Sequence, residues 1–386
     1  MINNLFALTK QLINYKSISP HDDGLMQVVS DYLLDMDFQI TNLNHNNVSN
    51  IFALYGSQDK PIIAFAGHID VVPAGDVSKW SHDPFTLHQQ EDRLYGRGIA
   101  DMKGAIACFL SAIKLFIQYN KVHNSSFFNH YSIAVILTSD EEGDAIYGTK
   151  HIVEYFIKHN IRLKYCILGE PTGNNIIGDV LKIGRRGSLS GFLEIEGIQG
   201  HVAYPHLNIN PIHQFSTILN KLINHEWDKG NYNFLPTALQ FTNLHAGIGV
   251  NNVTPNILQT SFNLRYNDLH SVKSIQDAIV DILNSQQITY KISWYDSAKV
   301  FINQAPILKQ ICIKVINNIN NIIPQFNTYG GTSDGRFLFT ISDELIELGM
   351  CNDSIHQINE NIKVQDLSNL QNIYYNILLE IAELTK

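Results

Sequence analysis

The sequence predicts an α/β protein: a mostly parallel sheet with helices on its faces, interrupted by an inserted α+β domain. Strand-like apolar runs and helical runs alternate through about the first 170 residues, which is typical of a parallel sheet. Beyond that point the strand-like runs alternate apolar and polar residues, which is typical of strands with one exposed face. After about residue 300 a helical pattern resumes, so the chain is expected to return to the first domain.

The spacing of the apolar residues assigns each element of the first part of the chain. The predicted helices span residues 5–15, 25–36, 104–119 and 148–159, and the predicted strands span residues 51–55, 62–66, 133–137 and 165–168.

In the inserted part, two helices are expected to cover one antiparallel sheet. The predicted strands span residues 189–196, 238–246 and 257–266, and the predicted helices span residues 211–225 and 272–283. A further helix is expected over residues 305–319. We therefore expect one domain of residues 1–180 and 297–386, with residues 181–296 inserted into it as a second domain.

Composition narrows the class of partner. The net charge of −9, with 16% charged residues and no basic stripe, argues against nucleic-acid binding and favours a small-molecule partner. Neither a signal peptide nor an apolar run long enough to span a bilayer is evident, so no membrane association is expected. The cysteines are scattered, which fits free thiols in a cytoplasmic protein; they are Cys108, Cys166, Cys312 and Cys351.

Arginine is scarce in this chain, so the positions that retain it carry information. A planar guanidinium is needed where a carboxylate must be bound by two parallel hydrogen bonds. We hypothesise this role for Arg185, Arg186, Arg265 and Arg336.

Three predicted strands lead directly into acid–base or metal-binding side chains. His68 follows the strand of residues 62–66, the Glu141-Glu142 pair follows residues 133–137, and Glu170 follows residues 165–168. The carboxyl ends of parallel strands meet at one edge of a sheet, so these side chains should converge. Each cluster alone is more often a solvated loop, but their coincidence with Asp101, just before a predicted helix, favours a zinc hydrolase.

The residue types suggest a division of labour. His68 and Asp70 lie two apart, so on an extended backbone they project to the same side, and Asp70 could orient the imidazole or contact the metal directly. Asp101 has two oxygens and could bridge two cations about 3.5–4 Å apart. Glu141 and Glu142 are adjacent, which favours a general base next to a metal ligand.

The chain resembles the M20 family of co-catalytic zinc metallopeptidases and deacylases, and most closely its succinyl-diaminopimelate desuccinylase branch. Two departures are mild: Ile69 stands where Thr is usual, and Gly349-Met350 stands near a usual Gly-Pro pair. The resemblance rests on GHIDVVP (67–73), YGRGIADMKG (95–104), DEEG (140–143), GEPT (169–172), GRRGSLSG (184–191), GHVAYPH (200–206), NVTPN (252–256), GGTSDGRF (330–337) and IHQINE (355–360).

The resemblance implies a zinc-peptidase catalytic domain that holds two Zn²⁺ ions per subunit, with Co²⁺ able to substitute, and an inserted dimerisation (lid) domain. One ion would be held by His68, Asp101 and Glu170, and the other by Asp101, Glu142 and His356. It also implies a cis peptide bond after Asp101.

The remaining roles also follow from the resemblance. Glu141 would be the base, and Asp70 would support His68. His201 would stabilise the oxyanion in the neighbouring subunit's site, which makes a homodimer the catalytic unit. Substrate contacts are implied for Arg186, Tyr204, Asn251, Arg265, Thr332 and Asn352.

The implied reaction is hydrolysis of N-succinyl-LL-2,6-diaminopimelate to succinate and LL-2,6-diaminopimelate, in lysine and diaminopimelate biosynthesis. A metal-bridged hydroxide, formed when water gives a proton to Glu141, would attack the amide. One alternative is another deacylase or dipeptidase of the family, such as an acetylornithine deacetylase, which would need fewer cationic contacts. The other is a metal-free binding protein of the same fold, which the full set of ligand residues disfavours.

Overall fold

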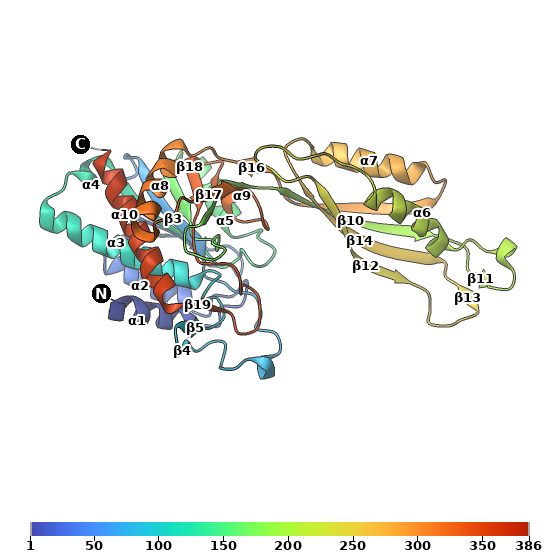
Figure 1. The fold of residues 1–386 in the computed structure, drawn as a ribbon, viewed down its shortest axis with the longest axis horizontal. Helices are drawn as coiled ribbons and strands as arrows, with labels where there is room; N and C mark the ends of the chain where they lie inside the picture. Colours follow the sequence, from blue (N-terminus) through green and yellow to red (C-terminus); the bar gives the residue numbers. More distant parts are fainter. Residues whose placement is uncertain (1, 385–386) are drawn as a thin grey trace. The chain divides into compact units, whose positions relative to one another are not determined.

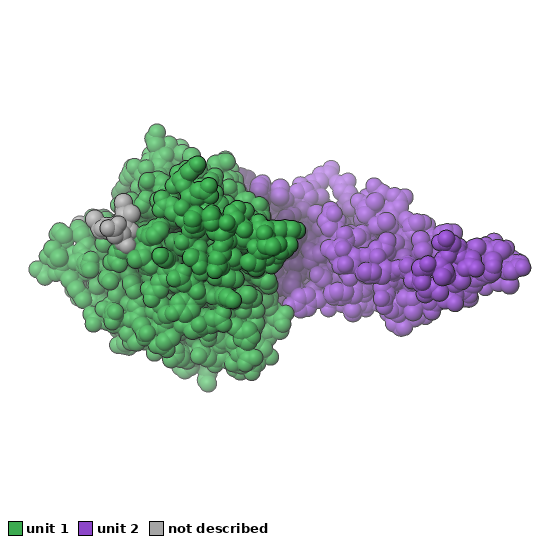
Figure 2. All heavy atoms as spheres, turned by 90° about the horizontal axis from the view of Figure 1, so that it is seen from below, with its two compact units in different colours: residues 1–184, 302–327, 333–386 green, residues 185–301, 328–332 purple. Residues whose placement is uncertain are grey.

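The computed structural model describes residues 2–384, which divide into two compact units (Figure 2). Unit 2 takes in residues 185–301 and 328–332, and unit 1 takes in the rest of the described chain. The chain therefore leaves unit 1 after Gly184 and returns to it at Ile302.

Unit 1 is built on an eight-stranded sheet. Its four pairs β3–β6, β3–β7, β7–β18 and β8–β17 are parallel, while β1, β2 and the short β8–β18 contact add antiparallel pairs. The predicted mostly parallel α/β sheet is thus confirmed. In spatial order the strands are β1 (Gln39–Asn42), β2 (Asn50–Tyr55), β6 (Ser132–Thr138), β3 (Ile62–His68), β7 (Leu163–Leu168), β18 (Ser342–Glu347), β8 (Val180–Lys182) and β17 (Gln325–Asn327).

Helices surround this sheet (Figure 1). The long helix α3 packs against α1 and α10, while α5 packs against β2 and α9. A small separate sheet, in the order β19–β5–β4, joins residues far apart in the sequence. The helices of unit 1 are α1 (Ile2–Ile13), α2 (Leu25–Leu34), α3 (Lys103–His123), α4 (Phe127–His130), α5 (Thr149–Lys158), α8 (Pro306–Asn320), α9 (Gly335–Leu338) and α10 (Val364–Glu383), and the small sheet comprises β4 (His88–Gln90), β5 (Arg93–Tyr95) and β19 (Asn361–Lys363).

Helix α3 is long and apolar enough to cross a membrane by length and composition, although the sequence analysis identified no such run. Its most apolar window is 61% buried inside the protein, and every residue from Lys103 to Leu110 is fully enclosed. This burial against α1 and α10 is that of a core helix.

Unit 2 is an antiparallel sheet, in the order β12–β14–β10–β15, with α6 and α7 packed on one face (Figure 1). Burial alternates along β14, and α7 buries Ile275, Ile279 and Leu283, four residues apart, so both elements turn one face to a shared core. The elements are β10 (Gly187–Glu196), β11 (Gly200–His201), α6 (Pro211–Ile223), β12 (Ala238–Ala246), β13 (Val253–Thr254), β14 (Ile257–Tyr266), α7 (Val272–Asn284) and β15 (Thr289–Ala298).

Three sizeable elements were not predicted from the sequence: β15, β18 and α10. Strand β18 carries three acidic residues, two of them buried, which weakens the apolar signal of a strand. Helix α10 has the expected signal, because its buried Leu370, Ile373, Tyr374 and Ile377 recur every three or four positions.

Candidate metal centre

Three neighbouring strands of unit 1 end at the same edge of the sheet. His68 is the last residue of β3 and is paired in parallel register with Thr138, the last residue of β6. Glu170 lies two residues beyond the end of β7, which flanks β3 on its other side. The sheet itself therefore brings these segments together, as the alternating strands and helices predicted.

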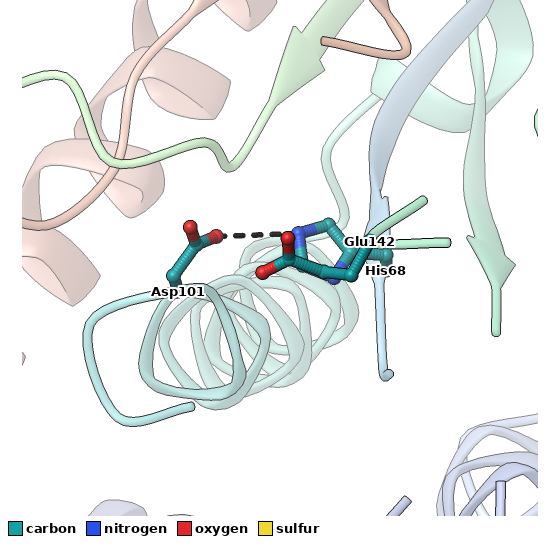
Figure 3. Close-up of side chains that lie close together, drawn as sticks. All are labelled: His68, Asp101 and Glu142. Carbon is teal, nitrogen blue, oxygen red and sulfur yellow. Dashed lines mark hydrogen bonds and ion pairs between the residues drawn. The ribbon is translucent and has the colours of Figure 1, made fainter. Parts of the chain in front are cut away.

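Asp101 completes the centre from a separate loop, immediately before α3. The peptide bond between Asp101 and Met102 is cis. Oδ1 of Asp101 lies 3.2 Å from Nε2 of His68, and Oδ2 lies 3.4 Å from Nε2 of His356. The two oxygens thus face two different histidines, and Figure 3 shows the side chains of His68, Asp101 and Glu142 turned toward one another.

The other predicted ligands lie in the same cluster. Oε1 of Glu142 is 2.9 Å from Nε2 of His356, and Oε1 of Glu170 is 3.8 Å from Nε2 of His68. His356 belongs to the loop before β19, and its side chain is 49% exposed, whereas His68 is almost completely enclosed. The cluster is therefore buried on the His68 side and open on the His356 side.

Two triplets have ligand atoms within 4.8 Å of one another: His68 with Asp101 and Glu142, and His68 with Glu141 and Glu170. The resemblance implies other groupings, with Glu170 on the ion of His68 and His356 on the second ion. The geometry brings all these residues to one centre, and their assignment to individual ions stays a prediction.

Asp70 supports this centre from behind. Nδ1 of His68 lies 2.9 Å from the backbone carbonyl of Asp70 and 3.6 Å from its Oδ1, so a proton on Nδ1 leaves Nε2 free for a metal. Oδ2 of Asp70 accepts hydrogen bonds from the backbone N–H groups of Glu141 and Glu142. One carboxylate therefore orients the imidazole and anchors the loop of the two glutamates.

The centre holds more negative charge than its histidines offset. Burial raises the pKa of Glu141, and the charge of Asp334 raises it further. Burial also raises the pKa of Glu170, together with the charges of Glu141 and Asp101. Hydrogen bonds to Asp101 and Glu142 raise the pKa of His356 to about 10.

Asp101 is affected in the opposite direction. Its burial disfavours the ionised form, but hydrogen bonds from His356 and His68 outweigh this and lower its pKa. Its ionised carboxylate is thus stabilised by cations on both sides.

These residues fit divalent cations. Oε1 of Glu170 is buried without a hydrogen-bond partner among the residues that the structure describes. Imidazole nitrogens and carboxylate oxygens together are ligands that Zn²⁺ accepts. A cation among them would satisfy the unpartnered oxygen and offset the concentrated charge.

Sequence reasoning missed two carboxylates near the centre. Asp334 is buried; burial raises its pKa to about 6, although a hydrogen bond with Thr149 opposes the shift. Glu360 is buried and binds the loop of Asp101. Both lie in motifs that carry the family resemblance, GGTSDGRF and IHQINE, so the motifs themselves were the available signal.

Two of the predicted substrate residues form a cationic pair within unit 2. Arg186 and Arg265 are half-buried, and burial lowers the pKa of each guanidinium. The charge of Arg186 lowers the pKa of Arg265 further, so the two groups lie close together. Nε of Arg186 is buried and has no hydrogen-bond partner in the described chain.

His201, Tyr204 and Asn251 lie at the other end of unit 2, around β11 and β13. All three are exposed, and the rings of His201 and Tyr204 are 5.6 Å apart. Arg265 pairs with Ser188 at one end of the β10–β14 ladder, and Ile257 pairs with Glu196 at the end next to β11. At 3.4 Å per residue the two ends are about 27 Å apart.

The last two predicted substrate residues lie outside these groups. Thr332 is partly buried and belongs to the short segment 328–332 of unit 2. Asn352 is partly buried in unit 1, where its backbone N–H donates to the carbonyl of Gly173.

Comparison with known proteins identifies the family. The model of peptidase family M20/M25/M40 matches residues 64–380. A succinyl-diaminopimelate desuccinylase from Blochmanniella floridana is 44% identical over 99% of this chain and 100% of its own length. Another from Hydrogenovibrio crunogenus is 44% identical, covering 98% of this chain and 99% of its own.

Solved structures show the same fold. An M20 family metallo-carboxypeptidase from Sulfolobus solfataricus aligns with a TM-score of 0.80 at 16% identity, over 98% of this chain and 99% of that one. A dinuclear metal-binding M20 peptidase from Bacillus subtilis aligns with a TM-score of 0.70 at 13% identity, over 99% and 98%. This chain belongs to peptidase family M20/M25/M40.

Proposed function

We propose that the protein is a zinc-dependent succinyl-diaminopimelate desuccinylase. It hydrolyses N-succinyl-LL-2,6-diaminopimelate to succinate and LL-2,6-diaminopimelate, a step of lysine and diaminopimelate biosynthesis. The observation that carries the proposal is the convergence of two histidines and several carboxylates at one sheet edge, in a chain with full-length relatives of that name. A metal-free binding protein would have no use for this buried charge.

The proposed centre holds two Zn²⁺ ions, which Co²⁺ can replace. His68 and Glu170 hold one ion, Glu142 and His356 hold the other, and Asp101 bridges them, in accord with its two oxygens facing different histidines. When bound, the ions make a nucleophilic water available near neutral pH and polarise the amide carbonyl.

Glu141 is proposed as the base. It lies between the centre and the open side, and its backbone is held by Asp70. It accepts the proton of the attacking water and returns it to the amine that leaves. Asp70 keeps His68 in one tautomer, so that Nε2 stays directed at the centre.

Arg186 and Arg265 are proposed to bind carboxylates of the substrate. Two adjacent guanidinium groups, one with an unpartnered buried Nε, form a region of unbalanced positive charge. A carboxylate satisfies such a region with charge-assisted hydrogen bonds. This pair favours a succinylated, multiply carboxylated substrate over the smaller acetylornithine. Further substrate contacts are proposed for Tyr204, Asn251, Thr332 and Asn352.

We propose a homodimer as the catalytic unit, in which unit 2 serves as the dimerisation (lid) domain and His201 stabilises the oxyanion in the partner's site. The separation of about 27 Å between the arginine pair and the His201 end of unit 2 supports this, because one small substrate is too short to touch both. Residues from two subunits could together surround one substrate. The four free, buried cysteines are in accord with a cytoplasmic location.

Hydrolysis assays of the purified protein test the proposal. We expect turnover of N-succinyl-LL-2,6-diaminopimelate well above that of acetylornithine or dipeptides, lost after chelation and restored by zinc. Preference for acetylornithine or a dipeptide would indicate the sibling activity instead. No hydrolysis of any of them with zinc present would contradict the assignment.

A further inference from the structure

We propose that Glu360 is a positioning residue for the metal centre, which keeps Asp101 and His356 in the relative arrangement that binds the ions. This inference rests on the proposed metal centre and adds a residue to which no role has been assigned. Glu360 is 1% exposed and acts through the backbone and side chains of other residues.

The carboxylate of Glu360 binds the turn that carries Asp101. Oε1 accepts hydrogen bonds from the backbone N–H groups of Ala100, at 2.9 Å, and Asp101, at 3.2 Å. Oε2 accepts from the backbone N–H of Gly98, at 2.9 Å, and from Nη1 of Arg97, at 2.7 Å. One side chain therefore holds the backbone of Asp101 itself and of the residues that lead to it.

Arg97 extends this contact to a third segment. Its side chain is 2% exposed, its Nη2 lies 3.4 Å from the carbonyl oxygen of Pro73, and its guanidinium lies 5.2 Å from the centre of the Trp80 ring. Pro73 belongs to the segment that begins at His68. The buried ion pair of Glu360 and Arg97 thus joins the segments that bear His68 and Asp101.

The backbone of Glu360 connects this turn to the loop of His356. Glu360 lies four residues after His356, and its carbonyl accepts a hydrogen bond from the N–H of Gly96, at 3.1 Å. From Asn361 onward the chain pairs with β5 in the small antiparallel sheet. A displacement of Glu360 would therefore move His356 and Asp101 relative to each other.

Loss of one partner should be felt at the metals. Each oxygen of Glu360 accepts two hydrogen bonds, and an amide in its place offers one acceptor oxygen and an NH₂ group that faces donors. The turn would have to shift to relieve that conflict, and Asp101 would shift with it. Changing residues that orient metal ligands typically weakens metal affinity or activity about 10–100-fold.

The test compares Glu360→Gln with Glu344→Gln. Glu344 is also a buried carboxylate of unit 1 that accepts backbone N–H groups, those of Ile307 and Leu308. It pairs with Tyr165 in β7, five residues before Glu170 and thus about 16 Å from the centre along the strand. Metal-depleted wild type and both variants are titrated with Co²⁺, and binding and the visible spectrum of the bound ion are recorded beside thermal unfolding.

We expect Glu360→Gln to bind Co²⁺ about 10–100-fold more weakly than wild type, with an altered spectrum and a lower kcat at little change in KM. Glu344→Gln should bind Co²⁺ like wild type even if its unfolding midpoint falls. Wild-type affinity and spectrum in folded Glu360→Gln would overturn the inference. So would equal losses of affinity in both variants, because a general loss of stability would then account for them.

If Glu360→Gln does not fold, Arg97→Lys carries the test. A single ammonium keeps the charge but cannot reach both Glu360 and the Pro73 carbonyl as the guanidinium does, so weaker Co²⁺ binding is expected. Wild-type Co²⁺ binding in this variant would overturn the inference. If wild type itself binds neither Co²⁺ nor Zn²⁺, the proposed function fails, and the failure is thereby distinguished from that of Glu360 alone.

Discussion

The metal centre of unit 1 and the candidate recognition residues of unit 2 are built on different principles. In unit 1, parallel strands end together and enclose His68, Asp101 and Glu170, each at most 7% exposed. In unit 2, Tyr204 is 55% exposed, and His201 lies far along the sheet from the arginines. The fold of one unit is sufficient to assemble the charges of the centre, whereas recognition by unit 2 needs contacts from beyond that unit.

The sharpest way to test this comparison is to remove the proposed base without touching a ligand. Glu141→Gln should retain both metals and lose about 10²–10⁴ in kcat, because the proton acceptor is gone. Steady-state kinetics and metal analysis check this, with Glu154→Gln, a largely exposed glutamate on α5, as control. Activity within a few-fold of wild type would refute the assignment of Glu141.

The recognition side is tested by replacing each arginine with lysine. Arg186→Lys and Arg265→Lys keep the charge but lose the planar fork, so kcat/KM for the succinylated substrate should fall roughly 10- to 100-fold, as expected for one lost charge-assisted hydrogen bond. A smaller loss is expected with acetylated amino acids. Arg162→Lys, an exposed arginine of unit 1, is the matched control. A uniform loss across substrates would indicate a structural role instead.

The interior of the centre is tested by metal content after dialysis. Asp101→Ala should lose most of both ions, while His356→Ala should keep about one per subunit, because a bridging carboxylate serves both sites. Zinc and protein are quantified in the same samples. Equal residual zinc in the two variants would contradict the bridging role.

Complementation tests whether unit 2 completes the partner's site. His201→Ala and Glu141→Gln, each expected to be nearly inactive, are co-expressed. About half of randomly paired dimers would be mixed, with one competent site each, so roughly a quarter of wild-type activity should return. Replacing His201→Ala with His213→Ala, an exposed histidine on α6, controls for expression and pairing.

Two results of that experiment would count against the proposal. No recovered activity in confirmed mixed dimers would place His201 in its own subunit's site. Full activity of His201→Ala alone would remove it from catalysis.

How much the sequence could predict differs between the two units in the same way. The order of strands and helices was enough to predict the parallel sheet and the convergence of His68, Glu142 and Glu170, because parallel strands end at one edge. Hydrogen bonds between distant loops leave no periodic signal, so the four bonds of Glu360 to residues 97–101 could not be predicted. Strand β18 was missed because its buried Glu344 and Glu347 look like exposed positions.

The central claim, a two-metal desuccinylase, is tested most directly by titrating chelated enzyme with zinc while following hydrolysis of N-succinyl-LL-2,6-diaminopimelate. We expect negligible activity without metal and a rise that saturates near about two equivalents per subunit, as a two-metal centre requires. Undiminished hydrolysis by the metal-free protein, or zinc binding without any hydrolysis of this substrate, would contradict the account.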